Sequence, residues 1–174
     1  MNLQEIYLTK NPYSRPDKRL TAVKGIVIHW VANPGSSAMQ NRNYFDNLRF
    51  QSTTYASAHF LIGLEGEVIQ CLLENEVGYH VGANRYSDLA LKNLSSYPNN
   101  CTLGIELCHP DWTGKFTGET LQSAKELVLE LCERYNLSRK DLYRHYDITG
   151  KDCPRWFVQN PDKWEEFLGG FPAV

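Results

Sequence analysis

The chain has 174 residues, a formal net charge of −2 and 42% hydrophobic residues, which suits one folded domain with a substantial core. The near-neutral charge and the lack of a basic cluster interleaved with aromatic residues argue against a nucleic-acid partner. No run of about 18 apolar residues occurs, so no segment is expected to span a membrane.

The cysteines and the N-terminal residues add two expectations about the whole chain. Five cysteines without regular spacing predict free thiols rather than a disulfide scaffold. The segment Met1–Glu5 lacks a basic region followed by an apolar stretch, so we expect no signal peptide and synthesis in the cytoplasm. We also expect one domain over residues 1–174 and a monomer.

The first half of the chain predicts strands separated by one helix. After an irregular arm with two prolines, the run of β-branched residues at 24–29 predicts a buried strand. Ser36 or Ser37 can then cap a helix over 37–50. Residues 57–63 and 67–72 flank a Glu-Gly turn and predict a hairpin. A short strand is expected over 78–81.

The second half continues the alternation of strands and helices. The polar stretch 84–100 is expected to be a long loop and is a candidate for one wall of a groove. An apolar strand over 101–108 follows it. Apolar residues at spacings of three and four predict a helix over 118–136, then a strand over 141–144. A last helix is expected after Asn160-Pro161, with Gly169-Gly170 ending it. Together these elements predict an α/β fold: a mixed central β-sheet flanked by helices on both faces, in a single domain.

The span from His145 to Pro154 places an imidazole, an ammonium and a thiol close together. Histidine and cysteine are the residue types that bind zinc best, and here they are His145 and Cys153. Lys151 brings a positive charge that can stabilise an oxyanion or lower the pKa of the thiol. Two ligands hold a metal weakly, so a metal site needs a third ligand from elsewhere in the chain.

His29 is the first candidate for that ligand. It lies at the end of the strand Gly25–Trp30, where open α/β sheets place their ligand sites. The alternative is a core histidine bonded to a backbone carbonyl.

Glu106 is the candidate base because it lies in an apolar strand, where desolvation would raise its pKa toward the range useful for proton transfer. Alternation places Gly104 and Cys108 on the same face as Glu106, and Gly104 would leave room for a substrate or a metal-bound water. The alternative is a structural salt bridge from Glu106 to Arg144 or Lys151.

These segments together resemble a known family, the type 2 N-acetylmuramoyl-L-alanine amidases, over about residues 20–168. The chain is similar to the catalytic domain of a bacteriophage endolysin or a bacterial autolysin of that family. The segments that carry the resemblance, in their order along the chain, are Gly25–Trp30, Ser57–Ile62, Gly78–Gly82, Leu103–Leu107 and His145–Pro154.

The resemblance implies a zinc enzyme that cleaves the amide bond between N-acetylmuramic acid and L-alanine of bacterial peptidoglycan. It implies that His29, His145 and Cys153 bind the zinc. Glu106 would be the acid/base and Lys151 would assist at the oxyanion. Some family members carry a catalytic tyrosine where this chain has Ala58, so Glu106 is expected to take that role here.

The resemblance also bears on substrate contacts and on where the protein acts. It implies that His80 lines the substrate groove; the alternative is a half-buried surface histidine. Trp30 and Trp112 are candidates for stacking on a sugar or peptide, and the alternative for each is a core residue. Without a signal peptide, a phage enzyme released later through a membrane lesion fits better than a secreted autolysin.

Two other functions stay open at this stage. One is a non-catalytic peptidoglycan-binding module of the same fold, although such modules typically lack the cysteine ligand. The other is a cysteine hydrolase that uses Cys108 or Cys153 with a histidine.

The remaining histidines and cysteines are assigned structural roles. His59 is expected to be a core histidine or a group behind the ligands, and His109 a solvated turn residue. Three further cysteines are expected to be small buried hydrophobes: Cys71, Cys101 and Cys132.

Overall fold

A six-stranded sheet forms the centre of the computed structural model, which describes all residues 1–174. The strand order is β1-β4-β3-β5-β2-β6. Only the β3–β4 hairpin is antiparallel; the other neighbours are parallel, so the sheet is mixed as expected. The strands are β1 (Leu3–Glu5), β2 (Gly25–Trp30), β3 (Phe60–Ile62), β4 (Val68–Gln70), β5 (Thr102–Leu107) and β6 (Leu142–Arg144).

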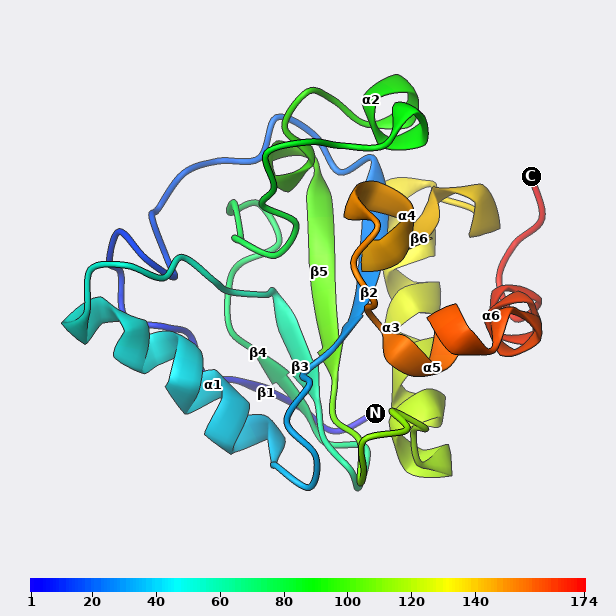
Figure 1. Cartoon of the computed structure of the whole chain (residues 1–174), viewed down its shortest axis with the longest axis horizontal. Coiled ribbons are helices and arrows are strands. Elements are labelled where there is room, and N and C mark those ends of the chain that lie inside the picture. The colour runs from blue at the N-terminus through cyan, green and yellow to red at the C-terminus, as the bar shows by residue number, and fades with distance from the viewer.

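Helices cover both faces of this sheet, which confirms the predicted fold class (Figure 1). The α-helices are α1 (Ala38–Asn47), α2 (Asp88–Asn93), α3 (Gly118–Tyr135), α4 (His145–Thr149), α5 (Arg155–Gln159) and α6 (Pro161–Leu168). Three short 3-10 helices complete the chain: η1 (Leu48–Phe50), η2 (Pro98–Asn100) and η3 (Arg139–Asp141).

Alternation along the strands divides the core between the two faces. Leu103, Ile105 and Leu107 of β5 point to the face covered by α3, α5 and α6, where the largest apolar cluster lies. On the other face, α1 packs against Leu61 of β3 and its neighbours. Next to it, α2 and α4 pack near Val27 of β2. Glu106 points to this second face, as the alternation predicts.

The two long helices begin where the sequence predicts. Ser37 caps α1 by accepting from the backbone N–H of Gln40, whose side chain accepts from the N–H of Ser37. Thr117 caps α3 by accepting from the backbone N–H of Thr120. Asn136 ends α3 in the left-handed conformation, with φ of 53°.

The short elements differ from expectation. Residues 78–81 do not form a strand, because side chains rather than a neighbouring strand satisfy their backbone donors: Ser57 Oγ accepts from Tyr79, and Asn99 Oδ1 accepts from His80 and Val81. The predicted loop 84–100 contains α2 and η2, and α4, α5 and β1 were not predicted. No helix of the chain has both the length and the apolar character needed to cross a membrane.

Candidate metal centre and active site

The candidate residues meet at the carboxyl end of three neighbouring parallel strands. His29 on β2 lies directly opposite Glu106 on β5 in the register of the sheet. His145 begins α4 immediately after β6, the neighbour of β2 on its other side. Gly150 then ends α4 with φ of 84°, and the chain turns back to bring Cys153 beside His29. Parallel topology therefore assembles the site at the edge where α/β sheets bind ligands.

His29, His145 and Cys153 direct their donor atoms at one point. The Nδ1 atoms of the two histidines are 3.1 Å apart, and Cys153 Sγ is 3.6 Å from His29 Nδ1. All three side chains are buried, and their ligand atoms lie within 4.8 Å of one another. Tetrahedral zinc with bonds of about 2.0–2.1 Å to nitrogen and about 2.3 Å to sulfur needs similar separations between its ligands. The donor set therefore fits a zinc ion.

Burial sets the protonation state of these groups. It lowers the pKa of His29 well below the usual range, and the nearby His145, His80 and Lys151 lower it further. The pKa of His145 falls to about 4, through burial first and then Lys151. Both imidazoles are therefore neutral at physiological pH, as metal ligands must be.

The two candidate nucleophilic thiols are poorly suited to attack a substrate. Burial raises the pKa of the Cys153 thiol far above its usual value, and Glu106 raises it further. Burial likewise raises the pKa of Cys108 to about 12, with contributions from Glu67 and Glu106. Nucleophilic cysteines need the thiolate, so the structure argues against the cysteine-hydrolase alternative.

Glu106 has no partner for one of its carboxylate oxygens, since Oε2 is buried without a hydrogen bond. Burial raises the pKa of this carboxyl group to about 8, and the positive charge of Lys151 opposes that increase. The salt bridge to Arg144 considered from the sequence does not form, because Arg144 pairs with Asp147 at 2.8 Å. No ion pair joins Glu106 to Lys151 within 4.0 Å either.

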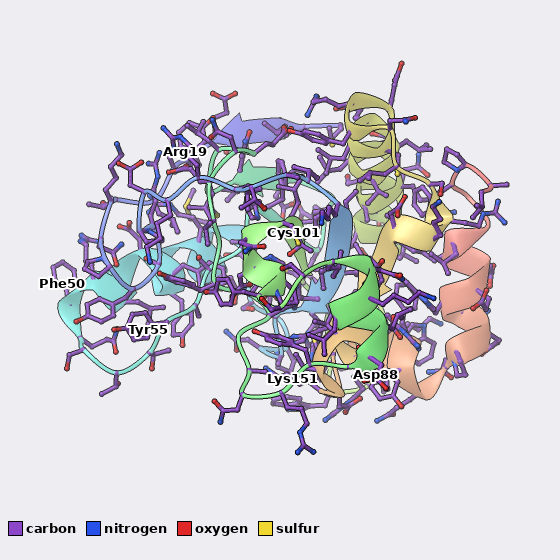
Figure 2. All side chains as sticks on the ribbon, turned by 90° about the horizontal axis from the view of Figure 1, so that it is seen from above. Arg19, Phe50, Tyr55, Asp88, Cys101 and Lys151 are labelled. Atoms are coloured by element: carbon purple, nitrogen blue, oxygen red, sulfur yellow. The ribbon has the colours of Figure 1, made fainter.

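A cavity of about 480 Å³ opens onto these groups. The three candidate metal ligands, Glu106 and Lys151 line one part of it. Figure 2 shows Lys151 on the side of α2 and α4, and Tyr55 at the opposite, α1 side of the molecule; both line the cavity. Four tyrosines also line the cavity: Tyr44, Tyr55, Tyr79 and Tyr97.

Residues 19–156 match the protein family described as N-acetylmuramoyl-L-alanine amidase. The chain belongs to this amidase family.

Named relatives agree with that assignment. The amidase chain is 38% identical to a Bacillus licheniformis protein named probable N-acetylmuramoyl-L-alanine amidase, over 92% of this chain and 44% of that protein. It is 35% identical to the N-acetylmuramoyl-L-alanine amidase BlyA of Bacillus subtilis (strain 168), with the same two shares. The chain thus spans less than half the length of these relatives.

Solved structures share the fold of the amidase chain. The catalytic domain of XlyA is 25% identical, with a TM-score of 0.74 over 98% of this chain and 99% of that one. PlyL is 18% identical, with a TM-score of 0.76 over 99% and 98% of the two chains, and this likeness concerns the fold alone.

The two predicted substrate contacts of the chain line the cavity but are largely buried. Trp30 is 6% exposed and stacks on His109 with ring centroids 4.6 Å apart, while Arg155 lies 4.7 Å from the Trp30 ring centroid. His80 is 7% exposed, and its Nδ1 lies 3.0 Å from His29 Nε2. Their role as substrate contacts stays a prediction.

Two expectations about neighbouring residues were wrong. His109 is fully buried rather than solvated, because the turn after β5 folds it onto the Trp30 ring and its Nδ1 contacts the carbonyl of Asp111. Gly104 does not leave room for a substrate or a water. The His80 ring occupies that space, and a Cβ on Gly104 would lie 2.6 Å from His80 Cγ.

The other assignments are confirmed. His59 is a fully buried core histidine whose Nδ1 accepts from the Gly104 N–H, while its Nε2 contacts the carbonyl of Glu76. Cys71, Cys101 and Cys132 are buried free thiols. The tyrosines of the cavity wall were missed, since their spacing did not distinguish them from core aromatic residues. The signals were the proximity of Tyr55 and Tyr79 to the histidine segments and the place of Tyr97 in the stretch 84–100, a candidate groove wall.

Proposed function

We propose that this chain is a zinc-dependent amidase domain that hydrolyses the bond between N-acetylmuramic acid and L-alanine in bacterial peptidoglycan. The observation that carries the proposal is the convergence of His29, His145 and Cys153 beside a buried Glu106, in one cavity of an amidase-family chain. The names of its relatives supply the identity of the bond.

His29, His145 and Cys153 would hold the zinc ion. Three protein ligands of this type are typical of catalytic zinc sites, which keep one position open. When bound, zinc supplies Lewis-acid chemistry: it polarises the scissile carbonyl and favours deprotonation of water.

Glu106 and Lys151 supply the remaining steps. A carboxyl group with a pKa of about 8 is close enough to neutrality to take a proton from the attacking water and return it to the leaving amine. The Lys151 ammonium lies in the same cavity and would stabilise negative charge on the carbonyl oxygen of the tetrahedral intermediate. One glutamate that carries one proton is sufficient for amide hydrolysis, whereas glycosidases use a pair of carboxyl groups.

The tyrosine wall, together with Trp30 and His80, would hold the glycan and stem peptide next to these groups. Tyr55 is 57% exposed and Tyr44 is 53% exposed, and exposed aromatic rings beside a catalytic centre are typical of ligand-binding grooves. The bacterial cell wall is therefore the proposed partner of the domain.

We also propose a role in host-cell lysis as a phage endolysin that is made in the cytoplasm as a monomer and reaches the wall after release. Similarity to the solved structure of a mutant endolysin from Bacillus subtilis supports this role. That protein is 26% identical, with a TM-score of 0.74 over 98% of both chains.

Digestion of purified peptidoglycan tests the proposed bond. N-terminal labelling of the products should reveal new α-amino groups on L-alanine, and a reducing-sugar assay should show no new ends. New reducing ends without alanine amines would indicate a glycosidase. New amines further along the stem would indicate an endopeptidase. Tight wall binding without any cleavage would indicate the non-catalytic module.

A further inference from the structure

His29 has polar contacts at both of its ring nitrogens. Nδ1 faces His145 Nδ1 and Cys153 Sγ, whereas Nε2 lies 3.0 Å from Nδ1 of His80. A neutral imidazole has a proton on one nitrogen and a lone pair on the other. The position of that proton therefore decides whether Nδ1 of His29 can bind a metal.

A chain of buried hydrogen bonds, which begins at the carbonyl of Pro98, determines which ring nitrogen of His29 carries the proton. The hydroxyl of Thr102 donates to the carbonyl of Pro98 at 2.8 Å and lies 3.2 Å from His80 Nε2. A carbonyl oxygen can only accept, so the single proton of Thr102 is used there. Nε2 of His80 must then donate to Thr102, which leaves His80 Nδ1 with its lone pair.

The same reasoning extends to the metal ligand. Because Nδ1 of His80 can only accept, Nε2 of His29 carries a proton and donates it. Nδ1 of His29 is then free and points at His145 and Cys153. Thr102 is fully buried, His29 is 2% exposed and His80 is 7% exposed, and each polar atom in this chain of contacts already has a protein partner within 3.2 Å.

The surroundings of His80 hold its ring in this position. Its backbone N–H donates to Asn99 Oδ1 at 3.2 Å. The ring packs directly on the backbone of Gly104, where a Cβ would lie 2.6 Å from His80 Cγ. His59 contacts the ring edge-on, with centroids 5.9 Å apart.

We propose that His80 is a positioning residue which, through Thr102 and Pro98, fixes the tautomer of His29 and so prepares Nδ1 for the metal. This inference rests on the proposed function only for the existence of the zinc site. Both ring nitrogens of His80 are engaged in these contacts, so its contact with a substrate in the cavity would be made by its ring carbons. Partners behind a metal ligand typically orient it and fix its tautomer in this way.

Nitrogen NMR of the ¹⁵N-histidine-labelled protein tests the tautomers without any metal. In the zinc-free wild-type chain, His29 and His80 should both be protonated at Nε2. Thr102→Ser should keep this state, because serine retains the hydroxyl, and Thr102→Val should lose it. A wild-type His80 protonated at Nδ1 would overturn the proposal.

Zinc affinity, measured by competition with a chelating indicator, provides the second test. Thr102→Val and His80→Gln should weaken zinc binding by about 10–100-fold, as is usual for loss of such a partner. Thr102→Ser should bind like the wild type. The matched control is Thr120→Val on α3, which removes another fully buried hydroxyl that donates to a backbone carbonyl, here Gly63 at 2.7 Å.

The outcomes separate this inference from the proposed function. Wild-type zinc affinity in both Thr102→Val and His80→Gln would overturn the positioning role, as would an equal loss in Thr120→Val. The expected tautomers and affinities in a protein that fails to cleave peptidoglycan would support the positioning role and refute the amidase proposal.

Discussion

Glu106 is an ionisable residue that the fold places in apolar surroundings, where its charged form is unfavourable. Its strand neighbours are fully buried apolar residues, and its Oε2 has no hydrogen-bond partner. An uncompensated carboxylate in such surroundings is costly, and the result is a pKa of about 8. Perturbed groups of this kind concentrate at functional sites, and Lys151 is the nearby cation that limits the increase.

Replacing Glu106 with glutamine should separate proton transfer from metal binding. Glu106→Gln keeps the shape of the side chain but cannot accept the proton, so activity should fall by about 10²–10⁴-fold while zinc content is unchanged. Activity is measured as the release of L-alanine α-amino groups from peptidoglycan, and zinc content is measured by metal analysis. Glu166→Gln, on an exposed residue of α6, is the control and should retain activity. A near-normal rate in Glu106→Gln would mean that Glu106 is structural.

The same substitution should change how stability depends on pH in the zinc-free protein. The pKa of Glu106 rises from an ordinary value of 4.5 to about 8 on folding. Between these values only the folded state holds the proton, so its contribution is complete at low pH and is lost as pH rises through about 8. Buried histidines with lowered pKa values change stability in the opposite direction, and the comparison with Glu106→Gln cancels their effect.

Urea unfolding at several pH values between about 6 and 8.5 measures this effect. The free energy of unfolding of the wild type should decrease relative to that of Glu106→Gln across the range. Parallel curves for the two proteins would show that Glu106 is ionised in the folded state already at low pH.

At the scale of elements, the sequence predicted long, periodic segments well and short ones poorly. The buried strands β2 and β5 and the amphipathic helix α3 follow from local pattern alone, and parallel strands ending in His29 and Glu106 allowed the site to be anticipated. By contrast, β1 exists only because it pairs with β4. The helix α2 exposes Leu89 and Leu91 and buries Ala90, so its pattern gives no apolar stripe. The close approach of His80 to Gly104 is a tertiary contact that no local pattern encodes.

The cap of α3 gives a test at this scale. Thr117 Oγ1 accepts from the N–H of Thr120 at 3.1 Å and donates to the carbonyl of Leu64 at 2.7 Å. Thr117→Ala should lower the free energy of unfolding by about 0.5–2 kcal/mol, measured by urea unfolding with an unchanged slope. Thr117→Ser retains the hydroxyl and should recover most of the loss. An alanine variant as stable as the wild type would show that water replaces the cap.

Across the whole molecule, the candidate metal centre joins parts of the chain that are distant in sequence. His29 belongs to a central strand, whereas His145 begins the short helix α4 and Cys153 follows that helix. Cys153 also lies in the main apolar cluster with α5 and α6. A metal bound to all three residues would therefore tie the sheet to its C-terminal helices. Because the unfolded chain has no such site, binding free energy is added to folding stability.

Removal of the metal should therefore lower the stability of the whole domain. An ion at about 100 times its Kd contributes about 2.7 kcal/mol, so a strong chelator should lower the melting temperature of the wild type, and added zinc should restore it. His145→Ala and Cys153→Ala should melt at the same temperature with and without zinc. Cys108→Ala is the matched control, because Cys108 is an equally buried free thiol outside the candidate cluster. The Cys108→Ala variant should be less stable because it loses packing contacts. Its melting temperature should still fall with the chelator, since His29, His145 and Cys153 are intact. If zinc raised the melting temperature of Cys153→Ala as much as that of the wild type, the stabilising ion would be bound elsewhere and the ligand assignment would fail.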